Sequence, residues 1–263
     1  MARARRAARA LAMLAVLLAG LLLVTAILSQ TAWFRERVRR LAMRQADQAL
    51  EGTLVIGAVE CNLLGGVTLR DVSLLQANVP VVRVGTVRLE YSIGDLLSSG
   101  RTVDRIVIDA PVIDAVRTSD GWNVAGLLKP RPPADPDKPR ATFTLPDIRV
   151  TNAQVTVREV GVPRTQAIPR RIEGLQFEGA IRSNLQELGI DVRRLTFRAG
   201  EPDLDLRSLA GRIVSVSRGW RFETVAVRTG ESDVVVEGTL SRQATDAPWT
   251  FDLDVAGKPV SLP

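Results

Sequence analysis

The chain has 263 residues, 46% hydrophobic and 24% charged, a composition typical of a folded protein with one or two domains. It has no histidine and one cysteine, Cys61. These facts exclude a Ser-His-Asp or Cys-His nucleophile, an HExxH zinc site, an internal disulfide and a CxxC metal or redox pair. We therefore expect no catalytic residue, no metal, no cofactor and no enzymatic activity.

The net charge of +6 comes from the N-terminus. Residues 1–50 hold nine arginines against Glu36 and Asp47, which leaves 26 of the 35 basic and 27 of the 29 acidic side chains for the rest. A nearly neutral remainder does not support a basic surface that follows a phosphate backbone. Nucleic acid is therefore not an expected partner.

The first predicted element is a transmembrane helix over residues 10–30, preceded by a basic cytoplasmic tail at 1–9. No charged residue lies between Ala10 and Phe34, and about 20 apolar residues are enough to cross a bilayer as a helix. Trp33 and Phe34 follow at the position of interfacial aromatic residues. A cleaved signal peptide is the alternative, and both interpretations carry the bulk of the chain across the membrane.

Residues 31–52 are predicted to form an amphipathic helix. Apolar residues recur at helical spacing, arginines occupy the other faces, and Gly52 ends the pattern. One interpretation is an ordinary helix that caps the fold. The other is a helix on the membrane surface whose arginines meet anionic headgroups.

From Thr53 onward the pattern is that of an all-β fold, with one recurring irregularity. Two apolar residues at alternate positions are followed, after a step of three, by two more. In a regular strand this step would send the second pair to the opposite face, whereas a β-bulge at the step keeps all four on one face. The pattern therefore predicts a mainly β fold with a curled, groove-like antiparallel sheet, and two short strands per segment in a sandwich are the alternative. The segments are Val67–Leu74, Val82–Leu89, Phe143–Val150, Ile190–Phe197, Leu204–Gly211 and Trp220–Val227.

A Pro-rich loop at 129–140 divides the β region. It separates an N-terminal β unit at 53–128 from a continuing β-groove at 141–263, which we expect to be cut within a run of strands. The candidates for lining an apolar groove are the apolar side chains of three stepped segments. They are Val82, Val84, Val87, Leu89, Ile148, Val150, Ile190, Val192, Leu195 and Phe197.

The order of these segments resembles the opening of proteins of the AsmA superfamily, most closely its TamB-like branch. The similar stretches follow a membrane helix and a second helix, and a Pro-rich loop comes after them. They read GVTLRDVSL at 66–74, VGTVRLEYS at 84–92, IVIDAP at 106–111 and DGWNVAGLL at 120–128. The resemblance covers nearly the whole chain, although members of this branch are far longer.

The resemblance implies a single-pass protein of the inner membrane whose bulk lies in the periplasm. It implies a repeating β-groove that binds or conducts phospholipid acyl chains for outer-membrane biogenesis. The alternative it carries is a scaffold or assembly factor for outer-membrane proteins, with an outer-membrane barrel protein as partner. A sheet with one apolar face must cover that face, and acyl chains suit an aliphatic lining.

Overall fold

A computed structural model describes most of the chain from residue 36 onward. The predicted tail at 1–9 and the transmembrane helix predicted at 10–30 lie outside the described residues, as does the Pro-rich loop except for Lys129. Within the described part, no helix has the length and apolar character needed to span a membrane. The described residues are 36–37, 39–40, 43–44, 46–47, 50–62, 66–92, 103–127, 129, 142–163, 168–184, 187–216, 219–242 and 248–258.

The described residues between 36 and 47 are α-helical, in agreement with this part of the helix predicted at 31–52. Glu36 lies near Arg39 and Arg40 one turn later, with N–O distances of 3.8 and 3.7 Å. Such exposed pairs add only a few tenths of a kcal/mol to a helix, roughly 0.3–0.5 each.

The rest of the described chain is mainly β, as predicted. Twelve strands form one sheet, and the short helix η1 (Ala125–Leu127) is the other regular element between the strands described here. The strands are β1 (Thr53–Asn62), β2 (Gly66–Gln76), β3 (Val79–Glu90), β4 (Arg105–Thr118), β5 (Gly121–Trp122), β6 (Phe143–Glu159), β7 (Arg171–Ser183), β8 (Leu188–Gly200), β9 (Leu204–Val216), β10 (Gly219–Thr229), β11 (Asp233–Ser241) and β12 (Thr250–Lys258).

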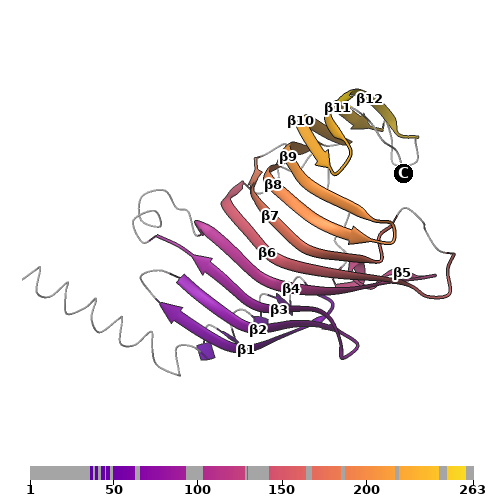
Figure 1. Ribbon diagram of the computed structural model, residues 1–263. Coiled ribbons are helices and arrows are strands. Elements are labelled where there is room, and N and C mark those ends of the chain that lie inside the picture. The colour runs from indigo at the N-terminus through magenta and orange to yellow at the C-terminus, as the bar shows by residue number, and fades with distance from the viewer. Residues whose placement is uncertain are drawn as a thin grey trace, which may run out of the picture.

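The strand order follows the chain order from β1 to β12, except that β5 pairs only with β4 (Figure 1). Neighbouring strands are antiparallel with one exception, the parallel pair β4–β6. The prediction of an antiparallel sheet is therefore wrong for this pair of strands. Parallel neighbours need a connection of about a dozen residues or more, and residues 119–142 provide it.

Local sequence explains two of the connections. Ala77 and Asn78 both have positive φ, 48° and 64°, as the two central residues of a type I′ hairpin turn require. After β5, the side chain of Asn123 forms two hydrogen bonds with the backbone of β4, as a neighbouring strand would. Its Oδ1 accepts a hydrogen bond from Val116 N at 2.7 Å, and its Nδ2 donates one to Asp114 O at 2.8 Å.

Bulges are present at four of the six predicted steps, whereas the steps of β2 and β3 pair three residues against three. Phe222 and Val225, three residues apart in β10, pair with Gly238 and Val236, which are two residues apart in β11. The same two-against-three pairing occurs at the predicted steps of β6, β8 and β9. Asp71 in β2 has a φ of 51°, and the ladders on both sides of it are interrupted there.

The sheet is a single open layer. Figure 1 shows a twisted sheet in which β10–β12 are turned relative to β1–β4. Each described strand contacts only its neighbours in the sheet, apart from the contacts that β2 and β5 make with η1. The sandwich interpretation requires strands packed face to face, so it is wrong for the described part of the chain.

A candidate apolar binding face

One face of the sheet carries an unbroken row of apolar side chains across ten strands. Residues directly opposite each other in neighbouring strands lie on the same face, so the pairing traces this row from strand to strand. It spans about 45 Å, because neighbouring strands are about 4.8 Å apart. The row is Val59, Leu69, Val87, Ile108, Val150, Phe177, Leu195, Leu209, Val227 and Val234.

The structure places all ten predicted lining residues on this apolar face. Val87, Val150 and Leu195 belong to the row itself. Leu89, Ile148 and Val192 follow in the next row, which also passes through Ile106 and Gly179. Val82 pairs with Ile113, Val84 with Pro111, Ile190 with Ile181 and Phe197 with Leu206. Val192 is buried and the other nine are half-buried.

The sequence analysis missed further members of this face. Leu54, Ile56, Val59 and Cys61 of β1 follow the stepped pattern fully, and pair with Leu74, Val72, Leu69 and Val67. Ile106, Ile108, Pro111 and Ile113 of β4 follow it with proline at the third position. Proline is unusual inside a sheet, but here it comes directly after Ala110, whose φ of 48° interrupts the ladder. A search for the same step of three that accepts Cys and Pro at the apolar positions would have found both strands.

The cover over the apolar face differs from one edge of the sheet to the other. At β1, Ile56 is 0% and Val59 is 7% exposed. Leu127 of η1 is also buried, and its carbonyl oxygen accepts a hydrogen bond from Glu51 N at 2.9 Å. At β12, by contrast, Phe251 is 74% exposed and Val255 is 62% exposed.

The opposite face is charged, and its charges alternate in sign from strand to strand. A positive side chain lies opposite a negative one, which in turn lies opposite a positive one, as cross-strand pairing favours. Three such groups are Glu90, Arg105 and Asp147; Arg149, Glu178 and Arg194; and Asp191, Arg212 and Glu223.

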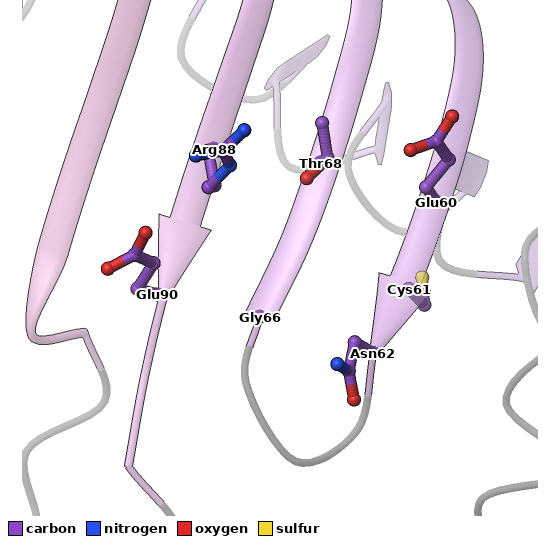
Figure 2. A pocket seen from close by; sticks show the side chains of 7 residues that line it. All are labelled: Glu60, Cys61, Asn62, Gly66, Thr68, Arg88 and Glu90. Atoms are coloured by element: carbon purple, nitrogen blue, oxygen red, sulfur yellow. The ribbon is translucent and has the colours of Figure 1, made fainter.

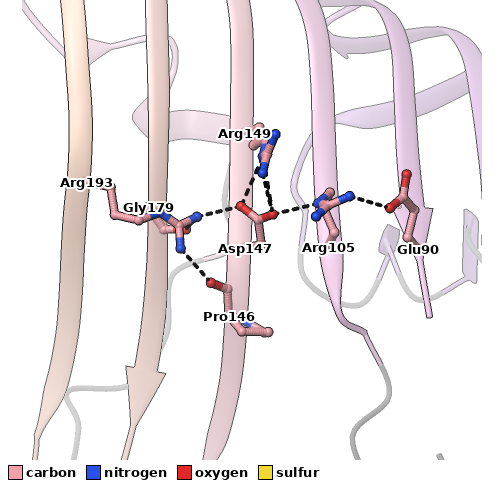
Figure 3. Close-up of polar contacts among 7 residues, drawn as sticks. All are labelled: Glu90, Arg105, Pro146, Asp147, Arg149, Gly179 and Arg193. Carbon is pink, nitrogen blue, oxygen red and sulfur yellow. Dashed lines mark hydrogen bonds and ion pairs between the residues drawn. The ribbon is translucent and has the colours of Figure 1, made fainter. Parts of the chain in front are cut away.

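Asp147 is the centre of the densest charge cluster on this face (Figure 3). Its Oδ2 lies 2.6 Å from Arg105 Nε and 3.1 Å from an Arg149 guanidinium nitrogen, and its Oδ1 lies 2.5 Å from an Arg193 guanidinium nitrogen. Arg105 also reaches Glu90 at 3.0 Å. Partial burial by itself would raise the pKa of Asp147, but the hydrogen bonds and charges of Arg105 and Arg149 lower that pKa below its usual value.

Two hollows of the described surface lie outside the row of apolar side chains, one with mostly polar and one with mostly apolar residues around it. A hollow of about 310 Å³ at the end of β1–β3 has charged and polar side chains around it (Figure 2). It holds the half-buried side chain of Cys61, which forms no disulfide. A second hollow of about 360 Å³ surrounds the end of β6, including Val157 and Arg170. The residues of the first hollow are Glu60, Cys61, Asn62, Gly66, Thr68, Arg88 and Glu90.

Carboxylates of β4 that recur every five residues do not meet in one site. Asp109 accepts a hydrogen bond from the Thr151 hydroxyl at 2.6 Å, and Asp114 lies 3.6 Å from an Arg83 guanidinium nitrogen. Among the described residues, no group of three or more Cys, Asp or Glu side chains could hold a metal ion. The arrangement that stands out among the described residues is therefore the apolar face itself.

Comparison of the chain with models of known protein families gives no match, and comparison with curated proteins gives none either.

Proposed function

We propose that the chain is a membrane-anchored periplasmic protein of the inner membrane that binds or conducts phospholipid acyl chains, as its resemblance to the AsmA superfamily suggests. The observation that carries the proposal is the unbroken apolar row from Val59 to Val234 on a single-layered sheet. The bulges in successive strands are taken to curl the sheet around this face into a groove.

Acyl chains fit this face better than a rigid ligand does. Its lining is mostly aliphatic, and it continues from strand to strand across the described row. Burial of a methylene group contributes about 0.8 kcal/mol. A chain of methylene groups lying across the strands would be retained strongly and could still slide, because each strand offers a similar contact.

Native mass spectrometry of the gently extracted full chain tests the proposal. Phospholipid should accompany the wild-type chain, and Ile148→Asp or Leu195→Asp should remove it, because a carboxylate among acyl chains has no partner. Gln154→Asp is the matched control, since Gln154 is exposed and pairs with Val112 on the charged face.

Circular dichroism should show that the Ile148 and Leu195 variants keep their β content. A wild-type chain without lipid, or variants that keep it, would refute the groove. Capture of outer-membrane barrel proteins by a lipid-free chain would instead favour the scaffold function.

A further inference from the structure

We propose that η1 is a stop at the β1 edge of the apolar face, which keeps acyl chains off β1 and confines them to the strands beyond it. This inference rests on the proposed lipid binding and adds where on the face a bound lipid ends. Leu127 is the residue that sets the boundary. Three observations at β1 and η1 support the assignment.

The first observation is that β1 is more deeply buried than its place in the sheet predicts. Among the described strands it pairs with β2 alone, so its side chains should be more exposed than those of inner strands. Ile56 and Val59 are instead 0% and 7% exposed. Val87 and Val150 lie in the same row as Val59 but on inner strands, and they are only half-buried. The chain itself therefore covers the apolar face at β1.

The second observation is that η1 lies on the apolar side of the sheet. Gln76, at the end of β2, is two residues beyond Leu74, so its side chain is on the apolar face. A Cβ added to Gly126 of η1 would lie 2.5 Å from Gln76 Nε2. A Cβ added to Gly52, just before β1, would lie 2.9 Å from Leu127 Cδ2. η1 therefore packs over the end of β1 and β2 that carries Gly52 and Gln76.

The third observation is that η1 is attached to the sheet on both sides. Asn123, two residues before η1, forms the two hydrogen bonds with the β4 backbone described above. The carbonyl oxygen of Leu127 accepts a hydrogen bond from Glu51 N at 2.9 Å, and the Leu127 side chain is 4% exposed. Burial of one leucine side chain is worth about as much as burial of two to four methylene groups. An acyl chain that displaced Leu127 from β1 would therefore gain little.

Photo-crosslinking of the full chain in detergent tests the proposal. The probe is phosphatidylglycerol with a diazirine group at the end of one acyl chain, and tandem mass spectrometry identifies the residues that it labels. We expect labelling of Ile108, Val150 and Leu195 on the apolar face. Leu54 and Ile56 of β1 should be labelled on the order of tenfold less or weaker still, the ratio to which burial of one leucine side chain corresponds.

The variant Leu127→Ala should remove most of this difference, because the shortened side chain leaves space for an acyl chain at the start of β1. Leu204→Ala is the matched control, since Leu204 is 39% exposed and lies on the apolar side of β9. It makes the same truncation away from η1 and should keep the wild-type pattern. Circular dichroism should show that both variants retain their β content, and the wild-type pattern tests the stop without any substitution.

Labelling of Leu54 and Ile56 in the wild type at the level of Leu195 would overturn the stop and leave the proposed lipid binding intact. An unchanged pattern in folded Leu127→Ala, or the same increase at β1 in Leu204→Ala, would overturn the role of Leu127. Absence of labelling on every strand would refute lipid binding itself and the stop with it, so the two failures are distinguishable.

Discussion

Substitution of Asp147 by asparagine should destabilise the sheet, because its carboxylate forms ion pairs with three arginines, one each from β4, β6 and β8. Asparagine keeps the shape of the side chain and removes its charge. The Asp147 side chain is 15% exposed, and those of Arg105, Arg149 and Arg193 are 40%, 44% and 47% exposed. Since the arginines are half in solvent, each contact is discounted to about 1 kcal/mol.

The sum is a loss of about 2–3 kcal/mol, or a fall in melting temperature of roughly 5–10 °C for a chain of this size. Thermal melting followed by circular dichroism measures it. Asp109→Asn is the control, because Asp109 is exposed and accepts a hydrogen bond from the Thr151 hydroxyl. It should shift the melting temperature by no more than about 2–3 °C.

The difference in stability between the wild type and Asp147→Asn should also depend on pH, with a definite sign. The pKa of Asp147 is lowered in the folded protein, so its contribution is fully present above the unfolded value of about 3.9. It is lost as the pH falls through the lowered pKa. The difference between wild type and Asp147→Asn should therefore be full at pH 7 and shrink below about pH 4. A difference that stays constant down to pH 2, or equal effects of the Asp147 and Asp109 substitutions, would refute the reasoning.

Three further predictions follow from single positions. Gly211→Ala should lower the melting temperature through about 2 kcal/mol of strain, since φ there is +149° and a Cβ would lie 2.6 Å from Val225 Cα. Gly85→Ala is the control and should not lower it, because the nearest atom to its Cβ, Asp109 O, would lie at 3.7 Å. Asn123→Ala should cost about 1–3 kcal/mol by removing two hydrogen bonds to β4, and hydrogen exchange at Val116 should become faster. Cysteines at Val84 and Val87, in a Cys61→Ser background, should react equally slowly with a water-soluble thiol reagent, and opposite rates would contradict their common face.

Much of the sheet could be predicted from sequence because the step of three is a local signal. It needs only the residues of one strand, and bulges at the steps of β6, β8, β9 and β10 return both apolar pairs to one face. In β7 the step lies between Ile172 and Leu175, and Arg170 stands where the first apolar residue of the pattern would be. The stepped segments were therefore found where the pattern is intact, and β1 and β4 were missed because cysteine or proline replaced an aliphatic residue.

The parallel pair and the charge cluster depend on contacts between distant residues. Arg105 and Asp147 are 42 positions apart, and they meet because β4 pairs with β6 after the crossover. A reader of the sequence sees arginines and carboxylates in nearly equal numbers and cannot tell which of them become neighbours before the register is known.

The bulges act together because they lie near one another across the sheet. Asp71 lies beside Gly85, Gly85 beside Ala110 and Ala110 beside Asn152, at positions where the ladders are interrupted. Residues with positive φ continue in the later strands, at Gly174, Gly211, Thr224 and Gly238. One bulge bends one strand, whereas a line of them bends neighbouring strands at the same level and keeps their pairing. Such a line lets a sheet curve without losing its hydrogen bonds, so apolar side chains on both sides of the line stay on one face.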